Sequence, residues 1–424
     1  MDSGPARTDR PDGATAFVNA TIVTGTGEPP FPGSVVIEGE RIVDLIEGSR
    51  TPRATALTVD CAGRTILPGL IDVHVHIGAL DADLREQQRR YFDSEAALRA
   101  GRNLLELLDQ GFTTARDAGG ADAGFRRAVE QGVVPGPRLR VSGRPLSQTG
   151  GHGDGRLATE HGDVMACGAR VGMRSRIADG ADQVLQAARE ELRRGADQIK
   201  VMAGGGVMSP TDRLESVQFT LPELQAAVEA ATGAGRHVLA HAYTPEAIRR
   251  SVLAGVRSVE HGNLLDQASA ELLAEHGVFL VPTLVTYEKL YEEGERHGLS
   301  RENLDKLAVV IDAGLESLRI AQPAGVRIAS GSDLLGSMSR HRGRELAIKA
   351  QVLGAMGAIV AATRTNAELL GLADEIGTLA PGKQADLIAV DGDPLADPGI
   401  LGHPETTPVV VTGGRLHRVL DHRR

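Results

Sequence analysis

Residues Ile71-Asp-Val-His-Val-His76 form a short run of β-branched and apolar side chains that ends in two histidines. Such residues favour a strand, and alternation along a strand points both imidazoles to the same side. Parallel α/β barrels build their active sites from polar residues at the C-terminal ends of their strands. We therefore expect this run to be one barrel strand and to contribute to a site.

The residues that follow alternate short apolar strands with helical stretches, which is the pattern of parallel βα units. The eight expected strands are Ile71–His76, Thr113–Asp117, Leu139–Gly143, Gln198–Met202, His237–His241, Ser258–His261, Phe279–Thr283 and Arg327–Asp333. Helices are expected at Asp93–Gln110, Asp182–Arg194, Thr220–Ala234 and Glu345–Ala362. Such units over roughly 250 residues match a (β/α)8 TIM barrel of the α/β class.

Both ends of the chain carry short apolar runs separated by turns, such as Ser34-Val-Val-Ile-Glu38 and Pro408-Val-Val-Val-Thr412. This texture is typical of short β-strands. We expect residues 16–66 and 376–424 to form one small β-sandwich domain, and residues 67–375 to form the catalytic barrel. Residues 1–15 show no periodicity and are expected to be a flexible tail.

Composition narrows the function classes. The 424 residues carry a formal net charge of −10, which offers no basic surface for nucleic acid or anionic membranes. The longest apolar stretch, Ala350–Ala362, falls short of the ~20 residues of a membrane span, and no signal peptide is visible. Cys61 and Cys167 are too few for a disulfide framework and fit a reducing compartment. We expect a cytoplasmic protein that acts on a small molecule.

Polar residues gather at the expected strand ends. They are His74 and His76 on the first strand, Lys200 on the fourth, His241 on the fifth, His261 on the sixth and Asp333 on the eighth. Neutral imidazole and carboxylate are usual ligands of zinc and similar divalent metals. A lysine that adds carbon dioxide becomes a carbamate anion able to bridge two ions, which requires a lowered amine pKa.

Each residue taken singly also has a structural interpretation. Lys200 alone fits an ion-paired or snorkelling lysine, and Asp333 alone fits a helix cap. His241 and His261 alone fit satisfied core or loop histidines. Their conjunction at one edge of the barrel favours a metal site, because chance would scatter them over both ends of the strands.

Several motifs resemble the amidohydrolase superfamily. They are Leu67-Pro-Gly-Leu-Ile-Asp-Val-His-Val-His76, Gly331-Ser-Asp333 and the tail Gly377-Thr-Leu-Ala-Pro-Gly-Lys-Gln-Ala-Asp-Leu-Ile388. Further stretches resemble its metal-dependent dipeptidases and N-acyl-amino-acid hydrolases, including prolidase-like and ochratoxinase-like enzymes. These are Ile199–Pro210, His241–Ile248, Val259–Asp266 and Ser332–Gly336.

The resemblance implies a binuclear site. His74, His76 and Asp333 would bind the more buried ion, His241 and His261 the second, and N6-carboxylated Lys200 would bridge both. A bridging hydroxide would attack the amide carbonyl, with Asp333 moving the proton to the leaving amine. Imidazole-rich ligation favours two zinc ions over magnesium, and the family also suggests a homo-oligomer.

The resemblance extends to substrate contacts. Tyr243, two residues past His241, would bind a substrate carboxylate or carbonyl, and His152 in Thr149-Gly-Gly-His-Gly-Asp154 resembles a substrate-contacting histidine. Each could instead be a packing or surface residue. His341 and Arg344 could shape the pocket. The triple glycine Gly204–Gly206 lacks the residues of a phosphate-binding loop and indicates close backbone approach instead.

The expected reaction is cleavage of an amide bond to a terminal amino acid, in an Xaa-Pro or other dipeptide or an N-acyl amino acid. A carbamate, urea or organophosphate substrate stays open, because the same hydroxide attacks all three. A mononuclear deaminase of the superfamily typically carries glutamate where this chain has Thr244. A metal-binding protein without activity is disfavoured by the complete set of ligand positions.

Overall fold

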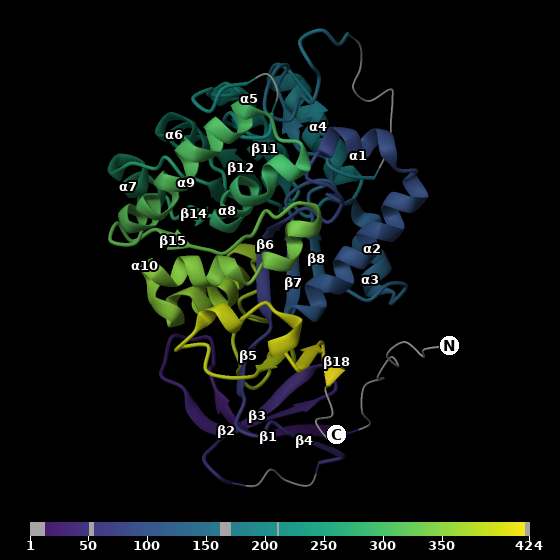
Figure 1. Cartoon of the computed structure of the whole chain (residues 1–424), viewed down its shortest axis with the longest axis vertical. Coiled ribbons are helices and arrows are strands. Elements are labelled where there is room, and N and C mark those ends of the chain that lie inside the picture. The colour runs from purple at the N-terminus through teal and green to yellow at the C-terminus, as the bar shows by residue number, and fades with distance from the viewer. Residues whose placement is uncertain (1–12, 51–54, 162–170, 210–211, 420–424) are drawn as a thin grey trace.

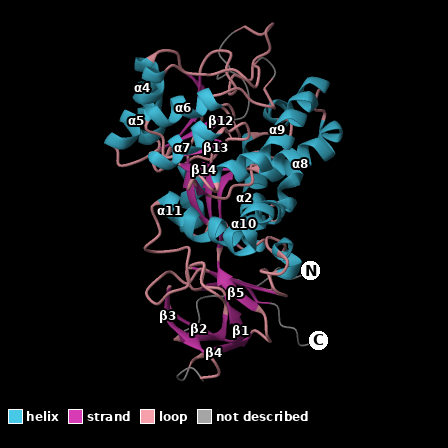
Figure 2. Cartoon of the chain, turned by 90° about the vertical axis from the view of Figure 1, so that its left-hand side faces the viewer, coloured by secondary structure: helices cyan, strands magenta, loops and turns pink. Residues whose placement is uncertain are grey.

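Two bodies of secondary structure make up the chain in this computed structural model, which describes residues 13–50, 55–161, 171–209 and 212–419. A larger body of helices encloses strands, and a smaller body of strands lies at one end of it (Figures 1 and 2). The larger body holds parallel sheets, and the smaller sheet combines strands from both chain ends. The expected fold class, a TIM barrel with a small β-domain, is confirmed.

The barrel strands form two parallel arcs. One arc has the order β6-β7-β8, and the other runs β10-β9-β11-β12-β13-β14-β15. The main strands are β6 (Leu70–Val75), β7 (Phe112–Asp117), β8 (Arg138–Val141), β11 (Ile199–Met202), β12 (Val238–Ala242), β13 (Ser258–His261), β14 (Phe279–Val281) and β15 (Arg327–Ile328), with the short β9 (Leu146–Ser147) and β10 (Arg176–Ile177) beside them. Each of the eight expected strands has a counterpart here.

Backbone hydrogen bonds join the two arcs at both junctions. The amide of Val73 on β6 donates to Ser330 O, just after β15, over 3.1 Å. The amide of Asp197, just before β11, donates to Val141 O on β8 over 2.7 Å. These bonds close the barrel and bring the ends of all its strands to one mouth.

The last strand is shorter than expected from sequence. The apolar pattern predicts Arg327–Asp333, whereas β15 ends at Ile328. Asp333 has a φ of +53°, in the left-handed region that an extended strand does not visit. The chain therefore leaves the sheet before Asp333, which sits on the following turn.

Helices cover the outside of the barrel. They are α1 (Leu84–Arg90), α2 (Asp93–Asp109), α3 (Ala123–Glu130), α4 (Ala181–Arg193), α5 (Leu221–Gly233), α6 (Pro245–Ala254), α7 (Gln267–Glu275), α8 (Leu284–Glu293), α9 (Arg301–Ala321), α10 (Arg344–Val360) and α11 (Asn366–Leu370). Local sequence sets several ends. Thr220 and Glu223 form a capping box at the start of α5, and Gly255 ends α6 in the left-handed conformation.

The small domain is one branched sheet of eight strands. Its members are β1 (Ala14–Ile22), β2 (Phe31–Glu38), β3 (Arg41–Glu47), β4 (Leu57–Asp60), β5 (Thr65–Pro68), β16 (Leu387–Val390), β17 (Val409–Thr412) and β18 (Arg415–Val419). A bulge at Asn19, with φ of +56°, lets β1 pair with β4 before it and β5 after it. The two branches enclose an apolar cluster that includes Phe17, Ile66 and Leu387.

One helical run is long and apolar enough to cross a membrane by length and composition alone. It spans the 27 residues Arg344–Leu370, with a mean hydropathy of 1.6 in its most apolar window, which differs from the expectation drawn from Ala350–Ala362. The run is interrupted at Gly354, whose φ of +72° and ψ of 163° are not helical, and 44% of the window is buried inside the protein. The run is therefore a broken, partly buried helix packed against the barrel.

A buried ion pair attaches α10 to the ends of two barrel strands. Lys349 Nζ lies 2.6 Å from Glu345 Oε1 and donates to Pro282 O and Ser330 Oγ, each over 3.1 Å. Glu345 Oε2 accepts the amide of Val285 over 2.7 Å. Since both charged side chains are buried, each depends on the other for compensation.

We predict that Lys349→Met lowers the free energy of unfolding by about 3–5 kcal/mol, because it leaves the Glu345 carboxylate buried without its cation. Urea denaturation followed by circular dichroism measures the change. Arg193→Met is the matched control, since the Arg193–Glu190 pair is exposed and is expected to contribute nothing measurable. Equal midpoints for the two variants would contradict the prediction.

Candidate active site

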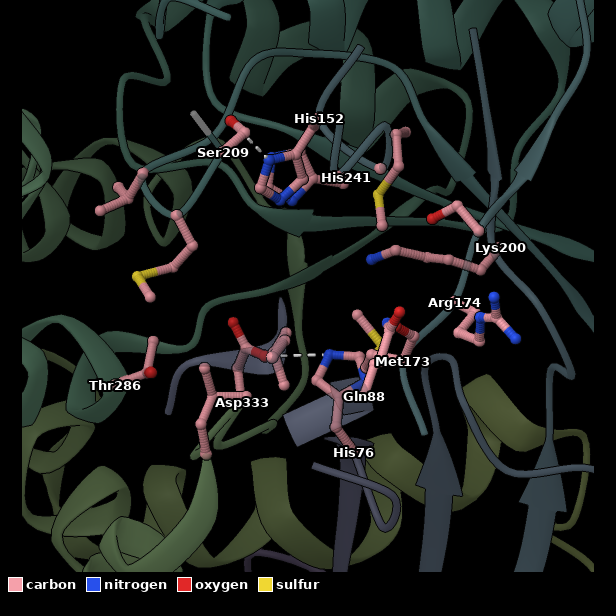
Figure 3. A pocket seen from close by; sticks show the side chains of 18 of the residues that line it. His76, Gln88, His152, Met173, Arg174, Lys200, Ser209, His241, Thr286 and Asp333 are labelled. Carbon is pink, nitrogen blue, oxygen red and sulfur yellow. Dashed lines mark hydrogen bonds and ion pairs between the residues drawn. The ribbon is translucent and has the colours of Figure 1, made fainter. Parts of the chain in front are cut away.

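A cavity of about 690 Å³ opens at the C-terminal ends of the barrel strands. Its lining includes every metal ligand and substrate contact proposed from sequence, namely His74, His76, His152, Lys200, His241, Tyr243, His261 and Asp333. Figure 3 shows His152 and His241 on one side of this space, Asp333 and His76 on the other, and Lys200 reaching in between them. The fold therefore brings these side chains together.

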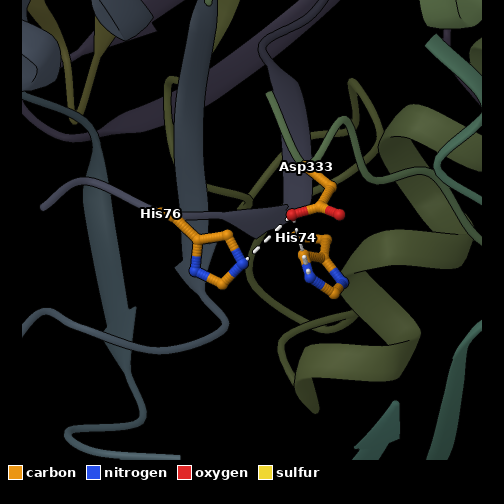
Figure 4. A group of neighbouring side chains, drawn as sticks. All are labelled: His74, His76 and Asp333. Carbon is orange, nitrogen blue, oxygen red and sulfur yellow. Dashed lines mark ion pairs between the residues drawn. The ribbon is translucent and has the colours of Figure 1, made fainter. Parts of the chain in front are cut away.

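His74, His76 and Asp333 form the tightest cluster, with one donor atom of each within 4.8 Å of the others (Figure 4). His76 Nδ1–H donates to Gly119 O over 2.9 Å, and His74 Nδ1–H donates to Glu260 Oε2 over 2.7 Å. With Nδ1 used in this way, each ring turns Nε2 toward Asp333. The Nε2 atoms of His74 and His76 lie 3.6 Å and 3.1 Å from Asp333 Oδ1.

This cluster suits a cation. Two Nε2 lone pairs and a carboxylate oxygen repel one another unless positive charge lies between them. Burial lowers the pKa of His74 well below its usual value, so that ring is neutral. Burial also acts against protonated His76, but its hydrogen bond to Asp333 outweighs this and raises the His76 pKa. A proton on His76 thus meets the same electrostatic need as a divalent ion.

His241 and His261 form a second pair of donors beside the first cluster. Their ring centroids lie 4.5 Å apart, and the His261 ring lies 5.0 Å from that of His74. His241 Nε2–H donates to Gly205 O over 2.9 Å, and His261 Nδ1–H donates to Thr283 Oγ1 over 2.8 Å. Burial lowers both pKa values well below the usual range. Each neutral ring therefore keeps one nitrogen lone pair to offer a metal.

Lys200 places a cation among these imidazoles. Its side chain is buried, and no hydrogen bond or ion pair reaches Nζ from any residue that the structure describes. Burial, with the charge of Arg116 nearby, lowers the pKa of Lys200 to about 8. A fraction of the amine is therefore neutral and nucleophilic near neutral pH, as carbamate formation requires.

A buried Arg116–Glu260 ion pair fixes the orientation of the His74 ring through the hydrogen bond between His74 and Glu260. Arg116 Nη2 donates to both carboxylate oxygens of Glu260 over 2.8 Å, and its Nε donates to Val73 O over 2.5 Å. Sequence reasoning missed Glu260, although it directly precedes His261. Alternation would send these neighbours to opposite sides of β13, but His261 has a φ of +74°, and both side chains approach His74.

The turn that carries Asp333 is held by several contacts. Asp72 on β6 accepts the Ser332 hydroxyl over 2.5 Å and Arg342 Nε over 3.1 Å. A Cβ added at Gly331 would lie 2.4 Å from His74 Cβ, so only glycine fits there. Asp72 was also missed from sequence, because its partners come from the far end of the chain.

Tyr243 and His152 both face the cavity, as their resemblance implied. The Tyr243 ring lies 4.9 Å from His241, and its hydroxyl lies 2.9 Å from that of Tyr287. The His152 ring stacks on His241 with centroids 4.3 Å apart and planes inclined by 20°. A Cβ at Gly206 would come within 2.0 Å of the His152 ring, so the glycine-rich stretch does serve close backbone approach.

Two residues considered from sequence as shaping the pocket take other places. His341 Nε2 contacts Glu293, and Arg344 pairs with Glu288, and neither residue lines the cavity. Asp117, the neighbour of Arg116 on β7, accepts backbone amides, including that of Ile77. Arg116 forms its ion pair with Glu260 instead.

Comparisons with known proteins identify the family of this chain. A family model described as the amidohydrolase family matches residues 65–416. Over 417 residues the chain is 32% identical to ochratoxinase from Aspergillus niger, covering 95% of this chain and 86% of that protein. A prolidase solved with N-methylphosphonate-L-proline has a TM-score of 0.92 at 41% identity, covering 96% of this chain and all of the other. A Xaa-Pro dipeptidase with bound methionine has a TM-score of 0.86 at 30% identity, with the same coverage. The chain belongs to the amidohydrolase family.

Proposed function

We propose that this amidohydrolase cleaves an amide bond to a terminal amino acid, in an Xaa-Pro or other dipeptide or in an N-acyl amino acid. One observation carries the proposal. Four imidazoles, a carboxylate and a buried lysine converge on one cavity, and each ring has one nitrogen that no partner outside this set occupies. Such a donor set suits divalent metals, and its richness in imidazole favours zinc.

The residues divide into two ligand groups with one shared bridge. His74, His76 and Asp333 would hold one ion, and His241 and His261 would hold the other. Carboxylated Lys200 would be an anion and would act as a ligand shared by both groups. Carboxylation would also remove the energetic cost of burying an ammonium group without a counter-charge. Bound ions would polarise the scissile carbonyl and activate water at neutral pH.

Asp333 is suited to move the proton during hydrolysis. Burial alone would raise its pKa, but His74 and His76 outweigh this, so its pKa lies below the usual value and the carboxylate is ionised. It can accept the proton of the attacking water as the C–O bond forms. The same proton then passes to the amine nitrogen as the C–N bond breaks, which leaves a carboxylate and a free amine.

Substrate recognition would use both polar and apolar walls. The buried Tyr243 hydroxyl is a neutral donor, because burial raises its pKa, and we propose that it binds the carboxylate of the terminal amino acid. Apolar side chains line part of the cavity: Leu84, Met173, Met202, Met208, Leu290 and Leu335. Unbranched methionines adapt to different shapes. The relatives' ligands, a proline phosphonate and methionine, are likewise amino-acid derivatives.

The geometry disfavours the mononuclear deaminase alternative. The position of that group's glutamate is held by Thr244, whose hydroxyl accepts the amide of Ala247 over 3.3 Å and caps α6. The side chain therefore has a structural role in the helix, away from proton transfer.

A substrate panel tests the proposed function. Zinc-loaded protein is assayed with Xaa-Pro and other dipeptides, N-acyl amino acids, and matched carbamates, ureas and phosphotriesters. We expect turnover of substrates with a free terminal carboxylate and a loss when that carboxylate is esterified. Turnover confined to carbamates, ureas or phosphotriesters would reject the amide proposal.

Asp333→Asn is expected to abolish measurable turnover, with kcat falling by about 10²–10⁴-fold. The amide of asparagine neither accepts the proton nor carries the charge of the carboxylate. Single-turnover kinetics measure the effect, and circular dichroism checks that the fold persists. Asp374→Asn, a substitution outside the cavity lining, is the control. Rates close to those of the parent in Asp333→Asn would refute its role.

Lys200→Ala is expected to lower bound metal from about two ions per chain to about one, since it removes the proposed bridge. Elemental analysis of protein produced with zinc and bicarbonate gives the count. Lys383→Ala, in the small domain and outside the cavity lining, should leave the count unchanged. A parent protein with one ion, unaffected by Lys200→Ala, would favour a mononuclear site.

A further inference from the structure

Three buried side chains and the half-buried His152 form a closed ring of hydrogen bonds behind the cavity. The backbone amide of His152 donates to Gln218 Oε1 over 2.8 Å, and Gln218 Nε2 donates to Asp212 Oδ2 over 2.7 Å. Asp212 Oδ1 accepts the hydroxyl of Ser209. Ser209 Oγ in turn lies 3.1 Å from His152 Nδ1, which returns the ring to its starting residue (Figure 3).

Hydrogen-bond direction around this ring is determined by its backbone member. The amide of His152 can only donate, so Gln218 turns its oxygen to His152 and its NH2 group to Asp212. Asp212 Oδ2 also accepts the amide of Gly206 over 3.2 Å. Burial raises the pKa of Asp212 to about 6, so above that pH the carboxylate is ionised and accepts at both oxygens.

The single hydroxyl proton of Ser209 is therefore donated, either to Asp212 or to Gly206 O, which lies 3.2 Å away. Its oxygen can then only accept from His152, which places the imidazole proton on Nδ1. His152 Nε2 is left as the unprotonated nitrogen, and none of the described residues offers it a hydrogen bond.

A lysine on α9 also anchors the ring. Lys306 on α9 donates to Asp212 O over 2.7 Å and to Ser209 O over 3.3 Å. The same glycine-rich segment orients His241 through Gly205 O. One segment thus sets the orientation of a proposed metal ligand and of the histidine stacked upon it.

We propose that Ser209 and Asp212 are positioning residues that fix the Nδ1–H tautomer of His152 and direct its Nε2 into the cavity as a proton acceptor. The inference rests on the proposed function, in which His152 touches the substrate. It assigns the substrate a hydrogen-bond donor at this point, such as the amide N–H of an N-acyl amino acid or a protonated oxygen formed during the reaction.

A double-mutant cycle tests whether Ser209 acts through His152. Ser209→Ala is expected to lower kcat by about 10–100-fold, the range seen when a supporting hydrogen bond is lost. In the His152→Ala background the same change should have less than a twofold effect, because its target is gone. Ser209→Thr keeps the hydroxyl and should recover activity relative to Ser209→Ala. Equal losses in both backgrounds would overturn the proposal.

Ser216→Ala serves as the matched control. Ser216 lies in the same segment, and its hydroxyl accepts the amide of Arg213 without contacting His152. Its removal should leave kcat, bound zinc and thermal midpoint unchanged. Ser209→Ala should likewise retain its zinc and midpoint, which separates positioning from a loss of structure.

A readout independent of activity covers the case in which the proposed substrates are wrong. Long-range ¹H–¹⁵N spectra of the zinc-loaded protein at pH 8 identify the protonated nitrogen of His152, assigned by the peak lost in His152→Ala. We expect Nδ1–H in the parent and a mixture of tautomers in Ser209→Ala. Nε2–H in the parent would overturn the proposal, whether or not amides are hydrolysed.

Discussion

The hydrogen bond from His74 to Glu260 is the interaction on which the rest of the site depends. Glu260 is fully buried in the interior of the barrel, where a carboxylate needs close partners for its charge. Arg116 supplies the compensating charge through two bonds of 2.8 Å, and His74 supplies a further donor. These contacts tie β6 and β7 to β13 across the barrel. Because Glu260 occupies Nδ1 of His74, only Nε2 of that ring is available, and it points toward Asp333.

Two strained positions turn this scaffold into a site. His261 and Asp333 both have left-handed φ values, +74° and +53°, which non-glycine residues seldom adopt. At His261 the strained backbone breaks the alternation of β13, so that Glu260 and His261, although adjacent, both approach His74. At Asp333 it takes the carboxylate off the sheet and above His74 and His76. Contacts from Asp72 and from the Lys349–Glu345 pair hold the surrounding segment in place.

The histidines differ in which nitrogen their fixed partner occupies. Gly119 O, Glu260 and Thr283 each occupy Nδ1, and Gly205 O occupies Nε2 of His241. The free nitrogen of each ring follows from that choice, so the shape of the donor set is determined by acceptors outside it. His152 obeys the same rule, with Ser209 as the acceptor. The cavity is thus surrounded by a layer of hydrogen bonds that set proton positions.

Periodicity and motif spacing were sufficient to predict the fold class and the residues that meet. Parallel strands closed into a barrel must place their C-terminal ends at one mouth, so polar residues at those ends become neighbours by geometry. His74, His76, Lys200, His241, His261 and Asp333 could be grouped in this way from sequence. The residues that orient these side chains could not be predicted from sequence. Glu260 lies 186 residues from His74, and Gln218 lies 66 residues from His152, so these contacts depend on the packing of distant segments. Local pattern contains no signal for which nitrogen is protonated, because that is set by hydrogen bonds that form only when the chain has folded.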